Sequence, residues 1–242
     1  MKKITCIVCA YNEGPRLGSV LSGLSNHPLL DNVIVVDDGS TDDTAEVARK
    51  FSNVQVISYS PNLGKTHALI TGVASAKTEF IMMIDADLSN LTPKNITELA
   101  EPVLFGDAGM SISLRKNSLL LFRLIGLDFV SGERVFAKII LSDISAINKL
   151  PPFGIEAYIN EKMIAGREKI AVVRWDNVGH LRKMSKVGWL RGRLGEFLTA
   201  LDVFKVLSPL KILRQNWAML ALSHNLVGTK PAIKASTEAS HE

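Results

Sequence analysis

The sequence contains little cysteine and no long uninterrupted apolar run. Its only two cysteines among 242 residues are Cys6 and Cys9, which excludes a disulfide framework for practical purposes. A single Cys-x-x-Cys pair is also weak evidence for zinc, so we expect two small buried residues on opposite faces of a strand. No apolar run reaches the roughly 18 residues of a spanning helix, and the run after Lys3 is too short for a secretory signal. These absences predict a cytoplasmic protein, with contact at the cytoplasmic face of a membrane as an open alternative.

Neither charge nor polarity is extreme over the whole chain. Charged residues make up 21% and hydrophobic residues 47% of the sequence, which are ordinary globular values that exclude wholesale disorder and a fibrous protein. The net charge of +4 is unevenly placed, since the segment from Arg174 to Arg214 has nine basic and three acidic residues, a surplus of six. Such a surplus suits phosphates, an anionic membrane surface or nucleic acid. Of these partners, we expect no nucleic acid.

Strand and helix patterns alternate through the first 88 residues. The strand patterns are continuous apolar runs, which are typical of strands buried on both faces of a parallel sheet. The predicted strands lie at 4–10, 32–36, 54–58 and 80–84. Helical spacing places helices between them, at 16–24, around 45–48 and at 66–76. The crossovers are long enough for parallel connections, so the pattern predicts an α/β fold with a nucleotide-binding type of sheet.

Three of these strands end in polar loops that the winding rule brings to one sheet edge. The loops are Asn12-Glu13, Asp37-Asp38-Gly39 and Asp85-Ala86-Asp87. Asp85 and Asp87 project to the same side of an extended segment, so they can converge on a hard cation such as Mg²⁺ or Mn²⁺. The alternative is a solvated loop, since Asp favours turns; the convergence of three loops favours the site. The first strand is not followed by Gly-x-Gly-x-x-Gly, which disfavours a dinucleotide cradle.

The second half is predicted to add helices and two strands. Strands are expected at 108–114 and 170–175, the latter being the last convincing one. Helices are expected at 95–105, 135–147 and 153–165, followed by a helical region at 194–226 that is interrupted at Pro209. We therefore expect one domain over 1–193, with a nucleotide-binding half (1–91) and an acceptor half (92–193). A helical extension (194–228) and a disordered tail (229–242) complete the predicted organisation.

Four spaced motifs resemble those of family 2 glycosyltransferases with the GT-A fold. They are Val8-Cys9-Ala10-Tyr11-Asn12-Glu13, Val36-Asp37-Asp38-Gly39-Ser40-Thr41-Asp42, Asn62-Leu63-Gly64-Lys65 and Asp85-Ala86-Asp87-Leu88. Later segments resemble the dolichyl- or polyprenyl-phosphate mannosyltransferase branch, namely Arg115, the run from Asp128 to Arg134 and the basic loop after His180. The resemblance implies a Rossmann-like, mostly parallel sheet flanked by helices, with a helical C-terminal extension.

The resemblance also implies a nucleotide-sugar donor, of the GDP-mannose or UDP-glucose type, and a Mg²⁺ or Mn²⁺ cofactor. The cation would be held by Asp87 with help from Asp85, and it would act as a Lewis acid on the diphosphate leaving group. Ser89 stands where the branch usually has an amide ligand, so His180 is the candidate third ligand; otherwise it is a hydrogen-bonded loop residue. The implied donor-binding residues are Ala10, Tyr11, Glu13, Asp38, Lys65, Asp85 and Ala86, with Asp38 accepting from the donor base.

The implied acceptor carries a phosphate and in this branch is polyprenyl-linked. The basic residues assigned to that phosphate are Arg115, Arg134, Arg182 and Lys183. Because a phosphate is ionised at neutral pH, it needs no strong general base. If the acceptor is instead a hydroxyl, Asp128 or Glu156 becomes the candidate base. The candidate catalytic residues are accordingly Asp87, Asp128, Arg115 and Arg134.

The region after Leu194 allows two interpretations. Its apolar residues exceed one buried stripe, while Lys205, Lys211 and Arg214 form a basic side. An interfacial membrane helix has this composition, and so does a helix packed on the sheet or on a second subunit. Trp189 and Trp217 would anchor at a headgroup layer or fill a core. Peripheral membrane contact and a homodimer through the C-terminal helices are both carried forward as predictions.

Three alternative functions stay open on the sequence. One is transfer to a soluble or hydroxyl-bearing acceptor. Another is a haloacid dehalogenase-type phosphatase, because Asp85-Ala86-Asp87-Leu88-Ser89 approximates that nucleophile loop; its late position and Ser89 argue against it. The third is a non-catalytic homologue that binds nucleotide sugars without turnover.

Overall fold

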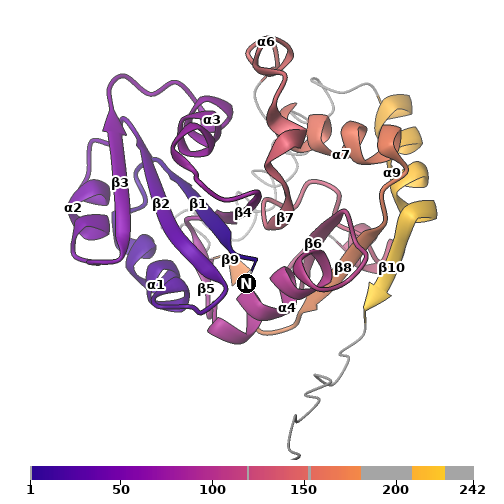
Figure 1. The fold of residues 1–242 in the computed structure, drawn as a ribbon, viewed down its shortest axis with the longest axis horizontal. Coiled ribbons are helices and arrows are strands. Elements are labelled where there is room, and N and C mark those ends of the chain that lie inside the picture. The colour runs from indigo at the N-terminus through magenta and orange to yellow at the C-terminus, as the bar shows by residue number, and fades with distance from the viewer. Residues whose placement is uncertain (1, 119, 152–153, 181–208, 227–242) are drawn as a thin grey trace, which may run out of the picture.

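The computed structural model describes residues 2–118, 120–151, 154–180 and 209–226. At its centre is an eight-stranded sheet in the order β10-β8-β6-β7-β4-β1-β2-β3 (Figure 1). Only β7 runs antiparallel, to both β4 and β6; the other neighbouring pairs are parallel. The strands are β1 (Ile4–Ala10), β2 (Leu30–Asp38), β3 (Val54–Tyr59), β4 (Phe80–Asp85), β6 (Met110–Arg115), β7 (Arg134–Ala137), β8 (Ile170–Trp175) and β10 (Ser223–Leu226). The predicted fold class, a mostly parallel α/β sheet flanked by helices, is confirmed.

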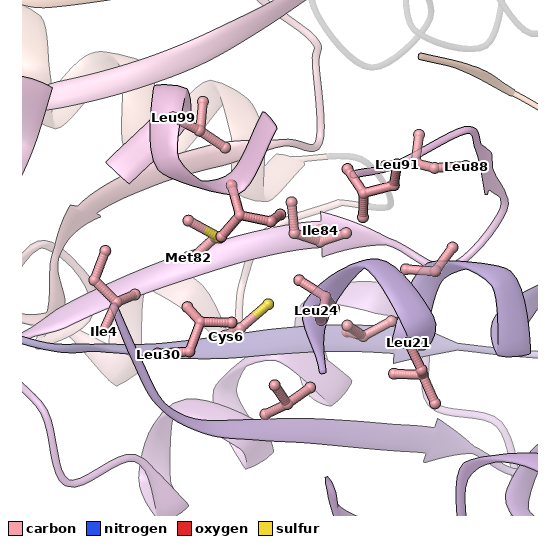
Figure 2. Packing of buried hydrophobic residues seen from close by; sticks show 14 of the residues in the cluster. Ile4, Cys6, Leu21, Leu24, Leu30, Met82, Ile84, Leu88, Leu91 and Leu99 are labelled. Carbon is pink, nitrogen blue, oxygen red and sulfur yellow. The ribbon is translucent and has the colours of Figure 1, made fainter. Parts of the chain in front are cut away.

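Helices cover both faces of this sheet, and each face has its own apolar core. One core joins the sheet to α1 (Gly14–Leu24), α2 (Thr44–Arg49) and α4 (Pro93–Leu104). Figure 2 shows part of it, with Leu21 and Leu24 of α1 and Leu99 of α4 lying over Cys6 and Met82 of the sheet. The other core joins the sheet to α3 (Lys65–Ser75), α5 (Leu120–Ile125), α7 (Gly154–Gly166) and α9 (Pro209–Leu222).

The two cysteines lie on opposite faces of β1, as predicted. Cys6 belongs to the core under α1 and α4, whereas Cys9 is partly buried and packs against the core under α3 and α7. Burial raises the pKa of the Cys9 thiol to about 12, so at neutral pH this thiol is protonated. Both residues act as small core side chains.

The prediction of a helix over 135–147 is wrong. The segment instead contains strand β7, a 3₁₀ turn η1 (Lys138–Leu141) and the short helix α6 (Ile144–Ile147). Val135 and Phe136 are fully buried between β4 and β6. A short apolar run in the middle of a sheet cannot be told from a buried helix by periodicity alone, which explains the error.

The C-terminal prediction is also partly wrong, because the chain does not stay helical to Leu226. Helix α9 ends at Leu222, and β10 then adds a parallel edge strand beside β8. The strand at 170–175 is therefore not the last one. The predicted helix at 194–208 and the tail at 229–242 lie outside the described residues, and the proposed boundaries at residues 91 and 193 stay predictions. None of the described helices has both the length and the apolarity to cross a membrane.

Candidate active site

The polar loops after β1 and β2 are joined by hydrogen bonds at one edge of the sheet. The backbone N–H of Asn12 donates to Ser40 Oγ at 2.9 Å, and the Asn12 side chain accepts from the Thr41 N–H at 2.8 Å. Parallel pairing places β4 directly beside β1, with Cys9 opposite Asp85. The predicted convergence of three strand-end loops is therefore present. Helix α2 begins after Asp43.

Asp38 shapes the loop that leads into α3. Its buried carboxylate accepts hydrogen bonds from the N–H groups of Leu63 and Gly64, both at 2.8 Å, and from Asn62 Nδ2 at 3.0 Å. Gly64 has a φ of 91°, a conformation that favours glycine. The Asn62-Leu63-Gly64 motif is thus the hydrogen-bonding partner of Asp38. The sequence did not predict this contact. The predicted contact of Asp38 with a donor base remains a prediction.

Lys65, the first residue of α3, bridges two carboxylates from different parts of the chain. Its Nζ lies 2.9 Å from Asp85 Oδ1 and 2.8 Å from Glu156 Oε1. Burial disfavours the charged ammonium, but Asp85 and Glu156 outweigh that cost and hold the pKa of Lys65 well above its usual value. The bridge connects the turn after β4 with the first turn of α7. In the sequence, Glu156 stood out as the one acidic residue in the otherwise apolar first turn of α7.

The Asp85 carboxylate also packs against the backbone of Gly132. A Cβ placed on Gly132 would lie 2.3 Å from Asp85 Oδ1 and 2.4 Å from Oδ2, so only glycine leaves room for this side chain. Asp87 is partly buried two residues further on. Ala86 between them is buried, and Ala10, at the end of β1, is buried as well, whereas Tyr11 is 47% exposed. Glu13 pairs with Arg16 across the first turn of α1.

Arg115, at the end of β6, is the centre of a buried ionic network. Its Nη1 lies 2.6 Å from Glu133 Oε1, and its Nη2 lies 3.9 Å from Asp128 Oδ2. Burial opposes the charge of Arg115, but Glu133, Asp85, Asp128 and Asp87 together raise its pKa. Asp85 and Asp87 are therefore close enough to act on Arg115 electrostatically. The sequence did not predict Glu133, which anchors Arg115 and whose own pKa is raised by burial.

Arg134 has surroundings that leave no place for a phosphate. A guanidinium has five N–H donors, and the five hydrogen bonds of Arg134 go to uncharged oxygens. The acceptors are the backbone carbonyls of Ser131, Glu156 and Phe129 and the side-chain oxygen of Asn160. The side chain is fully buried, and burial lowers its pKa. The acceptor role expected for Arg134 is therefore not supported; it ties the turn after Asp128 to α7.

A two-stranded ribbon brings His180 near the Asp85-Ala86-Asp87 turn. Strand β5 (Leu88–Ser89) pairs with β9 (Gly179–His180), with Leu88 opposite His180. The Ser89 hydroxyl donates to the Gly179 carbonyl at 3.0 Å, so Ser89 fixes the ribbon. Among the described residues, no group of three or more His, Cys, Asp and Glu side chains is arranged to hold a metal ion. The metal role of His180 stays a prediction, and Arg182 and Lys183 lie outside the described residues.

Residues 5–121 match the model of glycosyl transferase family 2. These 117 residues, just under half of the 242, are thus similar to that family. This match confirms the predicted family and favours it over the phosphatase alternative. The solved structures that the family 2 domain resembles support the GT-A fold, but these comparisons do not distinguish a polyprenyl-phosphate mannosyltransferase branch.

One curated relative is a named glycosyltransferase. The chain is 36% identical over 114 residues to a 4,4'-diaponeurosporenoate glycosyltransferase of Staphylococcus aureus, which covers 45% of this chain and 30% of that protein. It is also 36% identical over 141 residues to an uncharacterized protein of Methanocaldococcus jannaschii, covering 53% of this chain and 57% of that one. The chain thus spans between 30% and 57% of the length of these curated relatives.

A solved structure with the same fold contains a nucleotide, a metal and a glycosylated product. It is glucosyl-3-phosphoglycerate synthase from Mycobacterium tuberculosis in complex with Mn²⁺, uridine diphosphate and glucosyl-3-phosphoglycerate. The TM-score is 0.63 at 25% identity, with 80% of this chain and 75% of that chain covered. A second complex of the same enzyme holds Mn²⁺, UDP-glucose and phosphoglyceric acid, with a TM-score of 0.62 at 25% identity over 75% of this chain and 72% of that one.

Proposed function

We propose that this protein transfers a hexose from a nucleotide sugar to a phosphate-bearing acceptor, with the help of a divalent cation. The observation that carries the proposal is the Asp85-Ala86-Asp87 turn, at the carboxyl edge of the sheet of a family 2 domain. Open α/β sheets bind their ligands at this edge. The nucleotide-sugar donor is of the UDP-glucose type, since the structural relative was crystallised with UDP-glucose, and GDP-mannose is the second donor to test.

The residues of the turn fit a hard divalent cation. Oxygen ligands are those that Mg²⁺ and Mn²⁺ prefer. Because Lys65 already neutralises Asp85 at 2.9 Å, Asp87 is the principal protein ligand, with His180 as the candidate second. A bound cation would supply Lewis-acid stabilisation of the diphosphate leaving group. Mn²⁺ in the crystallised relative supports this assignment.

The remaining groups of the site have roles that follow from their positions. Lys65 orients Asp85, and Asp38 holds the loop that carries Lys65. Arg115 places a fixed positive charge near the turn, where it would face the acceptor phosphate or the departing diphosphate. An ionised phosphate needs no strong base. Phosphoglyceric acid in the relative supports a phosphate-bearing acceptor, and a polyprenyl phosphate is the lipid-linked version of that chemistry.

Product formation with defined donors tests the proposal. Purified protein is incubated with Mn²⁺, UDP-glucose or GDP-mannose, and either 3-phosphoglycerate or a polyprenyl phosphate, and the release of nucleoside diphosphate and the glycosylated product are measured. Asp87→Asn is expected to lower turnover on the order of 100-fold or more, because second-shell changes around metals already cost roughly 10–100-fold. Asp31→Asn, at an exposed aspartate near the start of β2, is the matched control and should leave turnover unchanged.

The outcomes separate the alternatives. Full activity of Asp87→Asn would remove the metal assignment. Tight binding of UDP-glucose and Mn²⁺ without any product would instead favour the non-catalytic homologue. Peripheral membrane contact and a homodimer through the C-terminal helices are further proposals, which co-sedimentation with anionic vesicles and light scattering test directly.

A further inference from the structure

Amide side chains join the loop that follows the Asp85-Ala86-Asp87 turn to the loop that follows β8. Asn95, in the first turn of α4, is only 3% exposed, and its Nδ2 donates to Asn177 Oδ1 at 3.2 Å. Asn177 Nδ2 donates in return to Asn95 Oδ1, also at 3.2 Å, and to the backbone carbonyl of Asn90 at 3.1 Å. One amide from the end of β8 therefore connects two points of the chain beyond the turn.

Asn177 itself lies at the surface, so its side chain is not needed to fill the core. The apolar contact between the two loops comes from its neighbours. Val178 is buried in the same core as Leu88 and Leu91, which Figure 2 shows close to each other. Apolar contacts have no preferred direction, whereas hydrogen bonds require a defined distance and angle. The amide bonds of Asn177 are therefore the contacts that can fix how the two loops are aligned.

This alignment decides the register of the ribbon that begins two residues later. Strand β9 pairs antiparallel with β5, with Gly179 opposite Ser89 and His180 opposite Leu88 (Figure 1). Strands of two residues have few ladder hydrogen bonds, and an isolated two-stranded ribbon is at best marginally stable. A slip by one residue turns the side chains of a strand to its other face. The position of His180, the candidate metal ligand, therefore depends on what holds the register.

We propose that Asn177 is a positioning residue for the divalent cation. Its amide fixes the register of the ribbon formed by β5 and β9, and thereby holds the backbone of His180 beside the turn that carries Asp87. The inference rests on the proposed function, since it concerns the cation of that reaction. Residues that orient metal ligands from outside the ligand set change metal affinity by about 10–100-fold when they are replaced. The loss of Asn177 should accordingly weaken cation binding and leave the rest of the fold intact.

Mn²⁺ binding in the presence of UDP tests the proposal without turnover. The full-length protein is titrated with Mn²⁺ and the free ion is measured by electron paramagnetic resonance. Asn177→Ala is expected to raise the Kd for Mn²⁺ about 10-fold or more. Asn177→Asp keeps the shape but puts an oxygen in place of the donor that faces Asn90 and Asn95, so it should weaken binding as well. Asn32→Asp is the matched control, because it removes one comparable bond, to Gln55 Oε1 at 2.9 Å near the amino end of β2, and should leave the Kd unchanged.

Hydrogen exchange separates a positioning role from a general loss of fold. In both Asn177 variants, backbone exchange should become faster over residues 88–92 and 176–180 and stay unchanged in β1. Unchanged Mn²⁺ affinity in both variants overturns the proposal, and so does a wild-type protein that does not bind Mn²⁺ with UDP. Faster exchange in β1 together with a lower melting temperature also overturns it, because the weaker binding would then come from unfolding.

The proposed function and the role of Asn177 can fail separately in these experiments. Weaker Mn²⁺ binding with unchanged exchange in β1 supports the role of Asn177 even if no pair of donor and acceptor gives product. Product formation by the wild-type protein with equal Mn²⁺ affinity in the Asn177 variants leaves the proposed function standing and removes the positioning role.

Discussion

Replacing Lys65 by methionine tests whether the bridge between Asp85 and Glu156 holds the site together. The ammonium lies 2.9 Å from one carboxylate and 2.8 Å from the other. Methionine keeps most of the apolar length but removes the charge, so two carboxylates are left without their shared cation. The side chains are 33% exposed for Lys65, 23% for Asp85 and 7% for Glu156. The perturbation therefore falls between a surface ion pair and a fully buried one.

The expected cost follows from that intermediate exposure. Breaking a buried pair costs about 3–5 kcal/mol and breaking an exposed pair about 0–1 kcal/mol, so we expect roughly 2 kcal/mol for Lys65→Met. In a protein of this size, 1 kcal/mol shifts the melting temperature by about 2–4 °C. The expected decrease is therefore about 4–8 °C by circular dichroism at pH 7.5 in metal-free buffer. Lys94→Met is the control, because the Lys94 side chain is 83% exposed and lies 3.7 Å from Glu98.

A second substitution shows whether the cost comes from the charges left behind. In the Lys65→Met background, Glu156→Gln removes the more buried carboxylate and should recover part of the lost stability, although in the wild-type background the same change should destabilise. The reasoning is refuted if Lys65→Met melts like Lys94→Met. It is also refuted if the two changes are simply additive.

Two further substitutions examine other contacts. Gly132→Ala places a Cβ 2.3 Å from Asp85 Oδ1, so it should lower the free energy of unfolding in urea by about 1–3 kcal/mol and weaken Mn²⁺-dependent donor binding. Gly18→Ala is the control, because the nearest atom to its Cβ is 3.7 Å away, and it should have neither effect. Equal effects of the two variants would contradict the packing argument. Burial lowers the pKa of His27 below 6.5, so the unfolded chain binds a proton first and stability decreases as pH falls below about 6.5. His27→Gln should flatten this decrease between pH 7 and 5 in urea midpoints, and an unchanged slope would exclude His27 as the cause.

The first half of the fold could be predicted because its strands are buried on both faces. Strand β1 was predicted at its observed bounds, and β4 to within a residue, since a parallel strand between helical layers must be apolar throughout. The same logic failed for β7. Its four residues, Arg134–Ala137, are apolar enough for a helix, and their antiparallel insertion between β4 and β6 depends on contacts distant in sequence. Strand β10, Ser223–Leu226, was missed because its four residues are mostly polar and give no strand pattern, while its pairing beside β8 depends on contacts distant in sequence.

The site was predictable where residues lie at strand ends and not where they meet across the chain. The Asp85-Ala86-Asp87 turn and its neighbours could be placed at one edge by the winding rule alone. The pairing of Lys65 with Glu156 spans 91 positions (156 − 65) and has no local signal. For Arg134 the error was an overprediction. The motif resemblance assigned it to a ligand phosphate, whereas its five N–H donors are occupied within the protein. A basic residue in a motif indicates a ligand site only if the carbonyl and carboxylate groups of the protein do not already occupy its N–H donors.

The balance of charge around the turn argues for a cation in the reaction. Three cations, Lys65, Arg115 and Arg134, stand among five carboxylates, those of Asp85, Asp87, Asp128, Glu133 and Glu156, a formal balance of −2 from 3 − 5. A diphosphate would be repelled by such a site unless a divalent ion came with it.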